Sequence, residues 1–87
     1  MKRSDSFLLR DVAGSLVIVP VGAAVAAFPG MMTLNATGAY IWELLETEQT
    51  IETLVQALTD RYDVTEEKAK EDVEAFIAKL KPTGAIV

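Results

Sequence analysis

Carboxylates make up most of the side chains in this sequence that could perform acid–base or ion-binding chemistry. Five of them fall within nine residues: Glu66, Glu67, Glu71, Asp72 and Glu74. A catalytic carboxylate pair needs a cleft that separates the two pKa values. Here the acids alternate with lysines, and Lys68 and Asp72 have the i, i+4 spacing of ion pairs on a helix surface. The pattern therefore favours a solvated helix face over a catalytic pair.

Other catalytic and metal-binding groups are scarce. The 87-residue sequence has no Cys and no His, which removes thiolate nucleophiles, imidazole bases and the usual zinc ligands. The acids from Asp60 to Glu67 lack the spacing and the central glycine of an EF-hand loop. The five glycines form no phosphate-binding loop. We therefore expect a protein that is not an enzyme and that uses no metal and no cofactor.

Charge and hydropathy restrict the partners. The formal net charge is −5, which disfavours nucleic acid. The uncharged stretch between Asp11 and Glu43 contains a segment, Val12 to Met32, that is long enough to span a bilayer. Glycines and prolines interrupt this segment, so we expect no membrane helix. The absence of Cys fits a cytoplasmic location.

The N-terminal part of the chain has the pattern of short strands. Ala13-Gly14 is a tight hairpin connection, and Pro20 is expected to end the second strand or lie on an edge. A small-residue loop, partly extended, is expected over Gly22 to Ala27, and Pro29-Gly30 is a turn signal. The three predicted strands are Phe7 to Val12, Ser15 to Val19 and Met31 to Leu34.

Three helices are predicted in the remainder of the chain. They begin after Asn35, Thr50 and Thr65, whose side chains can accept hydrogen bonds from the free N–H groups of a first turn. Pro82 and Gly84 end the third helix, and the last three residues are expected to add a short strand or pack on the core. Three short antiparallel strands followed by three helices predict an α+β fold like a winged helix-turn-helix, with residues 1–87 as one domain.

A winged helix-turn-helix raises the question of DNA binding. A DNA-reading helix carries Arg, Lys, Asn or Gln for bases and phosphates. The predicted third helix, Thr65 to Lys81, has five acidic and four basic residues and no Arg, Asn or Gln. We therefore expect no measurable affinity for duplex DNA at physiological salt.

Three large side chains bear on the core and on recognition. Trp42 borders the apolar stripe of the first helix, and we expect it in the core rather than at a recognition surface. Met31 and Met32 are adjacent in a predicted strand and must face opposite sides, so one of them is expected to be exposed. An exposed Met suits a surface that accepts varied apolar groups, and cover by a helix or a dimer partner is the alternative.

Several stretches together resemble the PqqD-like family of peptide-recognition domains, also called RiPP recognition elements. The most specific block is Leu-Asn-x-Thr-Gly-Ala-x-Ile-Trp-Glu-Leu-Leu, and the match covers nearly the whole chain. The stretches that carry it are Phe7 to Gly14, Val19-Pro20, Leu34 to Leu45, Thr50 to Val55, Arg61 to Val64, and Asp72 to Leu80 with Gly84 behind it.

The resemblance implies a winged helix-turn-helix that binds a peptide. The founding member of the family assists pyrroloquinoline quinone biosynthesis by presenting a precursor peptide to a modifying enzyme, a radical S-adenosylmethionine enzyme. In the family, the leader peptide adds as a strand beside the third strand and lies against the third helix. Carried over by position, the expected peptide-binding residues are Met31, Met32, Thr33, Leu34, Lys68, Ala69, Asp72, Val73 and Phe76.

The residues leave a second class of function open. A degenerate winged-helix module that binds another protein, for regulation or dimerisation, would have the same strands and helices. The Ala-rich stretch at 23–27 has few polar residues for a surface loop, and a partner protein or a second copy in a homodimer would cover it. A DNA-binding regulator is the third alternative.

Overall fold

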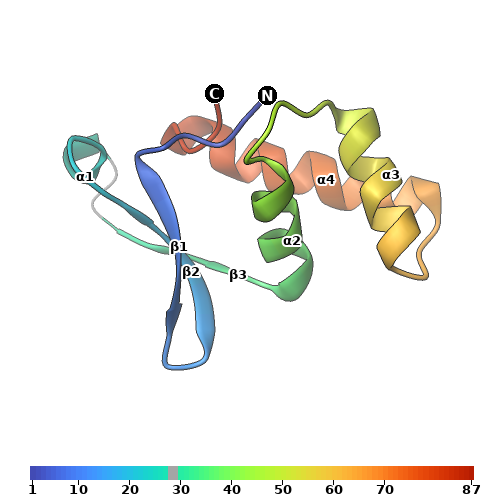
Figure 1. Ribbon diagram of the computed structural model, residues 1–87, viewed down its shortest axis with the longest axis horizontal. Coiled ribbons are helices and arrows are strands. Elements are labelled where there is room, and N and C mark those ends of the chain that lie inside the picture. The colour runs from blue at the N-terminus through green and yellow to red at the C-terminus, as the bar shows by residue number, and fades with distance from the viewer. Residues whose placement is uncertain (28–29) are drawn as a thin grey trace.

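The computed structural model describes residues 1–27 and 30–87, and it shows a small antiparallel sheet packed beside a group of helices (Figure 1). The expected α+β fold of three strands followed by three helices is confirmed, and the structure adds one short helix between the second and third strands. The elements are β1 (Phe7–Val12), β2 (Ser15–Pro20), α1 (Ala24–Ala27), β3 (Met32–Leu34), α2 (Ala36–Leu44), α3 (Ile51–Arg61), α4 (Glu66–Leu80) and a terminal 3-10 turn, η1 (Lys81–Thr83).

The β1–β2 hairpin turns at the predicted dipeptide. Ala13 and Gly14 have φ values of 53° and 85°, which is the left-handed pair that a two-residue hairpin loop requires. The Gly14 N–H donates to Asp11 Oδ1 at 3.0 Å. Val12 lies opposite Ser15 in the register. In this type of hairpin the two residues that flank the turn exchange both ladder hydrogen bonds. This fixes which residues of β2 direct their N–H and C=O groups toward β1 and which direct them away from it.

The segment before β3 differs from the sequence prediction. We expected a small-residue loop over Gly22 to Ala27, and the structure has the one-turn helix α1 there. Alanine has the highest helix propensity, and Gly22 takes a left-handed φ of 61° before the turn begins. The predicted turn at Pro29-Gly30 includes Pro29, which lies outside the described residues. β3 begins at Met32, one residue later than expected.

Each long helix begins at the predicted residue. Asn35 Oδ1 accepts a hydrogen bond from the Gly38 N–H at 2.7 Å. Thr50 forms a capping box with Thr53, and Thr65 accepts from the Lys68 N–H at 3.1 Å. These caps satisfy N–H groups that a helix start leaves free, so they fix where α2, α3 and α4 begin.

The core lies between the inner face of the sheet and the three long helices. Trp42 is 1% exposed, so its predicted core position is confirmed. The Arg3 guanidinium lies 5.7 Å from the Trp42 ring centroid and donates to the Trp42 carbonyl at 3.1 Å. The largest fully buried side chains are Trp42, Ile18, Ile41, Leu45, Leu54, Leu58, Leu80 and Val73.

The two chain ends meet beside this core (Figure 1). Arg3 and Ile86 form an isolated antiparallel bridge, and Lys2 and Val87 exchange backbone hydrogen bonds of 2.7 Å in both directions. Ala85 and Ile86 are buried whereas Val87 is 72% exposed, so the expected packing on the core is confirmed for two of the last three residues. Among the described residues, no helix has the length and apolar character needed to cross a bilayer.

Candidate functional site

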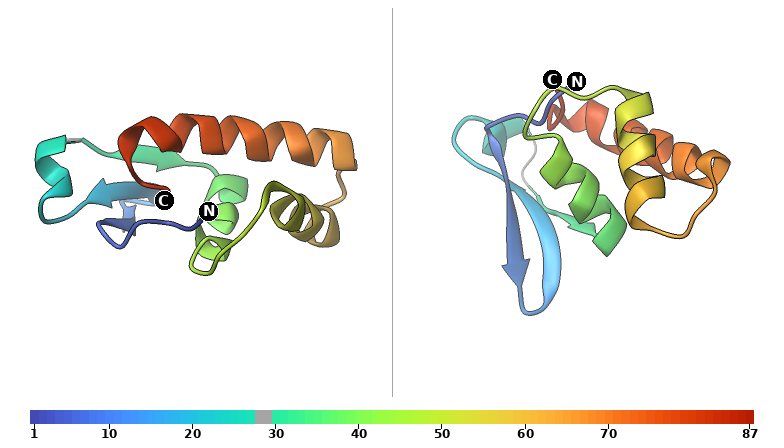
Figure 2. Two further views of the ribbon diagram at one scale, coloured as in Figure 1. Left: turned by 90° about the horizontal axis from the view of Figure 1, so that it is seen from above. Right: turned by 45° about the vertical axis from the view of Figure 1, so that its right-hand side comes forward.

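One edge of the sheet is open and lies beside α4. The strand order is β1-β2-β3, so among residues 1–27 and 30–87 β3 has a neighbouring strand only on its β2 side. Figure 2 (left) shows β3 running alongside the C-terminal half of α4. Thr33 of β3 and Phe76 and Lys79 of α4 line one hollow between the two elements. The open edge therefore borders a groove whose other wall is a helix.

The backbone groups that face this groove follow from the register. Leu16 and Ile18 lie opposite Leu34 and Met32. Because the pair beside the hairpin turn is hydrogen-bonded, alternation along β2 directs the N–H and C=O groups of Leu16 and Ile18 toward β3. Met32 and Leu34 are thus the residues that pair with β2. Thr33, between them, directs its own N–H and C=O toward the open edge.

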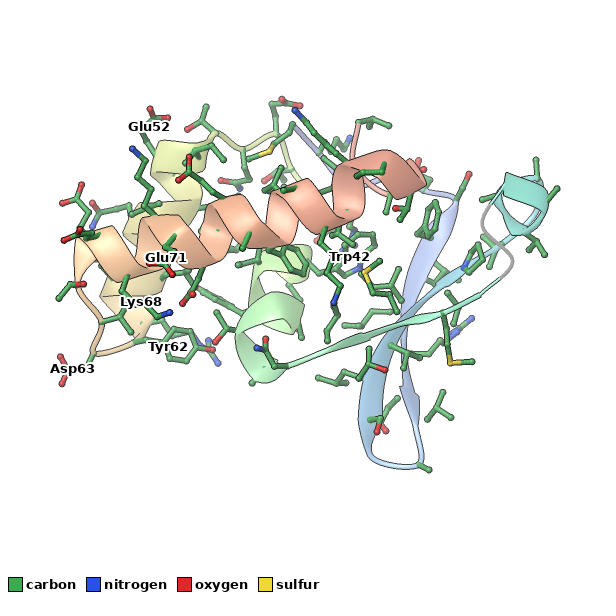
Figure 3. All side chains as sticks on the ribbon, turned by 180° about the vertical axis from the view of Figure 1, so that it is seen from behind. Trp42, Glu52, Tyr62, Asp63, Lys68 and Glu71 are labelled. Carbon is green, nitrogen blue, oxygen red and sulfur yellow. The ribbon has the colours of Figure 1, made fainter. Side chains whose placement is uncertain are left out.

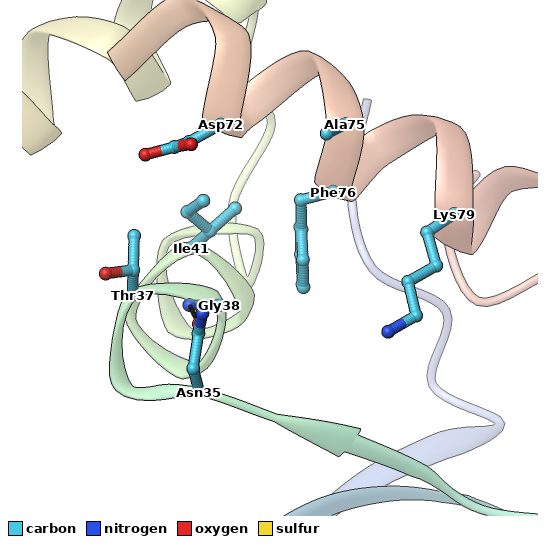
Figure 4. Close-up of a pocket in the computed structure, with 8 residues that line it drawn as sticks. All are labelled: Asn35, Thr37, Gly38, Ile41, Asp72, Ala75, Phe76 and Lys79. Carbon is cyan, nitrogen blue, oxygen red and sulfur yellow. Dashed lines mark hydrogen bonds between the residues drawn. The ribbon is translucent and has the colours of Figure 1, made fainter. Parts of the chain in front are cut away.

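Two adjoining hollows form the groove, and Figure 4 shows the residues that line the one between α2 and α4. One has a volume of about 390 Å³ and lies against β3, and the other has about 270 Å³ and lies between α2 and α4. Both are lined by Asn35, Gly38, Phe76 and Lys79. The first is lined in addition by Thr33 and Leu34, and the second by Thr37, Ile41, Asp72 and Ala75.

The groove depends on a glycine at position 38. The half-buried Phe76 ring projects from α4 over the start of α2 (Figure 4). A Cβ atom on Gly38 would lie 3.1 Å from Phe76 Cε1 and 3.2 Å from Asn35 Oδ1. Any side chain at position 38 would therefore displace the Phe76 ring or the Asn35 cap.

Charged side chains lie at both ends of the groove. Lys68 Nζ is 3.1 Å from Asp72 Oδ1 in an i, i+4 pair on α4. The pKa of Lys68 is raised above its usual value, first by its hydrogen bond to Asp72 and then by the negative charges of Asp72 and Glu71. Lys68 is therefore charged at neutral pH. Lys79 lies two turns along the helix from Asp72. A ligand in the groove would thus meet a carboxylate at one end and an ammonium group at the other.

The structure places the predicted site residues in different surroundings. Thr33, Leu34, Asp72 and Phe76 line the groove. Met31 precedes β3 and is 60% exposed, whereas Met32 is half-buried against the core, so the prediction that one Met is exposed is confirmed. Lys68 pairs with Asp72 without lining the hollows. Ala69 and Val73 are 0% exposed, which places their side chains in the core and out of reach of a ligand.

Six lining residues were not in the predicted list, namely Asn35, Thr37, Gly38, Ile41, Ala75 and Lys79. Asn35, Thr37 and Gly38 belong to the first turn of α2, directly after β3. The sequence carried a signal for them, because a cap residue that follows an edge strand must lie at the end of that edge. Lys79 is three residues after Phe76 and seven after Asp72, which puts all three on one face of α4.

No cluster of metal ligands accompanies the groove. The described residues contain no group of three or more His, Cys, Asp or Glu side chains that could hold a metal ion. The groove offers main-chain hydrogen-bonding groups, an aromatic ring and flanking charges. These groups suit the binding of an extended peptide.

Comparison with known proteins gives one family and two similar structures. A family model described as "Coenzyme PQQ synthesis protein D (PqqD)" matches residues 15–86. The structure titled "TbiB1 in Complex with the TbiA(beta) Leader Peptide" is 25% identical with a TM-score of 0.75, covering 98% of this chain and 93% of that chain. The structure titled "Lasso peptide synthetase B1 complexed with the leader peptide" is 22% identical with a TM-score of 0.73, covering 95% and 92%. No curated protein sequence matches the chain.

Proposed function

The chain belongs to the coenzyme PQQ synthesis protein D (PqqD) family, and from this premise we propose that it captures the leader segment of a ribosomally made precursor peptide and presents it to a modifying enzyme. The single observation that carries the proposal is the open edge of β3, whose Thr33 backbone faces a groove walled by α4. The likeness to the structure of TbiB1 in complex with the TbiA(beta) leader peptide supports the proposal.

The proposed binding mode is strand addition. A leader segment laid along β3 would exchange main-chain hydrogen bonds with Thr33, and these bonds are independent of the leader's side chains. Specificity would come from side chains that enter the hollows beside Phe76. Because alternate residues of a strand face opposite sides, only every second leader residue would enter the groove.

The lining of the groove suggests which leader side chains fit. The hollow between α2 and α4 has an apolar surface in Ile41, Ala75 and Phe76 and a volume of about 270 Å³, enough for one large apolar side chain. An acidic leader residue would be favoured beside Lys79 and a basic one beside Asp72. Both charged groups are partly solvated, so each would contribute modestly.

The chemistry would belong to the partner enzyme. We propose that this chain adds no catalytic group and no cofactor, and that a peptide-modifying enzyme, such as a radical S-adenosylmethionine enzyme, acts on the presented peptide. We place this step in the cytoplasm, where ribosomally made precursors are synthesised. The precursor and the chain would then meet before any export.

Calorimetry with a synthetic leader peptide tests the proposal. The peptide is the leader segment of a precursor chosen from the short open reading frames near the gene for this chain, and the remainder of that precursor is the control. We expect the leader to bind with a 1:1 stoichiometry and the remainder to give no heat of binding. Equal binding of both segments, or of neither, would contradict leader capture.

Reversing the charge of Asp72 is expected to weaken this binding. Asp72→Lys places a longer side chain of opposite charge at the wall of the smaller hollow, so the dissociation constant should rise about 5- to 10-fold. Since the position is partly exposed, the melting temperature should change by only a few degrees. Calorimetry and thermal melting measure the two effects.

Glu71→Lys is the matched control for this change. Glu71 is the neighbouring acid on α4, is exposed and does not line the groove (Figure 3). The substitution Glu71→Lys changes the net charge by the same amount as Asp72→Lys does. It should leave the leader's affinity within about 2-fold of the wild-type value. If the two variants weaken binding equally, the effect is long-range electrostatics and Asp72 does not border the bound peptide.

Adding one methyl group at position 38 should affect binding more than stability. Gly38→Ala gains roughly 1 kcal/mol of helix propensity, because glycine is unfavourable inside a helix. The added Cβ, at 3.1 Å from Phe76 Cε1, would require the ring that walls the groove to shift by a few tenths of an ångström, which would offset that gain. We expect a leader affinity several-fold weaker, with a free energy of unfolding within about 1 kcal/mol of the wild-type value. Unchanged affinity would show that the Phe76 position is irrelevant to binding.

A further inference from the structure

A second groove lies on the far side of α4, between α3 and α4. It has a volume of about 550 Å³. Its lining residues come from one face of α3, from the connecting turn and from the first two turns of α4. They are Ile51, Glu52, Val55, Gln56, Thr59, Val64, Glu66 and Lys70.

The groove has an apolar floor. Val55 is buried at its base, and Ile51 is half-buried beside it. Val64, in the turn between the two helices, is 37% exposed and is one of the large apolar side chains that the described chain leaves in contact with solvent. These three apolar side chains are bordered by five polar or charged lining residues, and a mixed surface of this kind between two helices can receive the apolar face of an amphipathic helix.

The rim of the groove is acidic. Residues 51–80 carry eight carboxylates against four basic side chains, so most of the chain's negative charge lies on α3 and α4. Glu52 and Glu66 border the groove on its two sides, and Lys70 is its basic lining residue. The potential at this surface therefore favours an occupant that carries Lys or Arg beside its apolar residues.

This groove is separate from the β3–α4 groove. Glu66 and Lys70 lie roughly 130° around α4 from Asp72, Phe76 and Lys79, at 100° per residue. Figure 3 shows Glu52 on one side of α4 and Lys68 and Tyr62 on the other. A leader peptide on β3 would leave the α3–α4 groove open, so both could be occupied at once.

We propose that the α3–α4 groove docks an amphipathic, positively charged helix of the modifying enzyme. The inference rests on the proposed function only in naming that enzyme as the owner of the helix. A presenting module needs a surface for the enzyme that the leader does not cover, and this groove meets that need. A second copy of the chain is disfavoured, because its α3–α4 surface carries the same negative charge. Nucleic acid and anionic lipid are repelled for the same reason.

A synthetic helix tests the chemistry of the occupant. The probe is a peptide of about 14 residues, or four turns, with leucine on one face and lysine on the other. The control peptide has glutamate in place of lysine. Amide spectra of the full chain, without leader peptide and with an excess of it, are recorded during titration of each. We expect shifts at Ile51, Val55 and Val64 with the lysine peptide and none with the glutamate peptide.

Three variants separate docking from general charge attraction. The double variant Glu52→Lys and Glu66→Lys should bind the lysine peptide at least 10-fold more weakly. Val64→Asp should bind it several-fold more weakly, although this substitution adds negative charge. Glu71→Lys, on the solvent-facing surface of α4, should change it less than 3-fold. If Val64→Asp strengthens binding, or Glu71→Lys weakens it as much as a rim substitution does, attraction is unspecific and the inference is wrong.

Leader affinity in the same variants keeps the two proposals distinguishable. The rim variants should bind the leader peptide as the wild type does. If the lysine peptide shifts Thr33 and Phe76 instead, or competes with the leader, it occupies the leader groove and a separate docking groove is refuted. If the leader does not bind at all while the lysine peptide docks between α3 and α4, leader capture fails and the docking groove stands.

Discussion

Trp42→Ala is expected to lower the free energy of unfolding by about 3–5 kcal/mol, the cost of truncating a large buried aromatic side chain. Trp42 is 1% exposed within the core, and the Arg3 guanidinium lies 5.7 Å from its ring centroid. Domains of this kind are stable by only about 5–15 kcal/mol in total, so the loss is a large fraction of the whole. Urea denaturation followed by circular dichroism measures it.

Trp42→Phe is the control for this prediction. It keeps an aromatic ring in the cavity and should cost considerably less than the alanine variant. One outcome would contradict the prediction that Trp42 serves the core. A Trp42→Ala protein that unfolds at the wild-type urea concentration but no longer binds leader peptide would make Trp42 a recognition residue.

Thr33→Pro is expected to weaken leader binding by about 10- to 100-fold. Proline has no N–H, so one main-chain hydrogen bond to the leader is lost and a peptide carbonyl is left unpaired, which costs about 1–3 kcal/mol. The β2–β3 ladder keeps its own bonds, because it is Met32 and Leu34 that pair with β2. An edge strand tolerates proline on its open side, so the fold should survive. Calorimetry with the leader peptide measures the loss.

Thr33→Val separates the backbone from the side chain. It keeps the N–H and the branched shape and removes only the hydroxyl, so leader affinity should stay within about 3-fold of the wild-type value. A thermal melt of Thr33→Pro must show a cooperative transition for the comparison to count. A folded Thr33→Pro protein that binds leader as tightly as Thr33→Val does would show that the edge of β3 is not the docking strand.

The hairpin and the helix starts could be predicted from the sequence because their signals are local. Ala13-Gly14 takes the left-handed pair of angles that the turn needs, and Asn35, Thr50 and Thr65 cap the helices through their own side chains. α1 was missed because a run of small residues is compatible with both a loop and one helical turn. There the helix propensity of alanine decided the outcome.

The site could be predicted only in outline. The apolar residues of α4 repeat with helical period, and that period does not distinguish those that face the core from those at its border. Ala69 and Val73 are core residues, whereas Phe76 lies at the border, where the groove begins. Which apolar residues of α4 face the core, and which lie at its border, depends on the angle at which α4 crosses β3 and α2. That angle is a tertiary property, so the close approach of Phe76 to Gly38 is seen only in the folded chain.

Amide chemical shifts during titration with the leader peptide test the central claim most directly. If the leader adds to the open edge of β3, the shifts should concentrate on residues 32–35 at the β3 edge, on Gly38, and on residues 72–79 of α4. The Thr33 amide should also become protected from hydrogen exchange, because it would donate to the bound strand. Shifts concentrated on the β1–β2 hairpin or on α3, with Thr33 exchanging as fast as in the free protein, would contradict the claim.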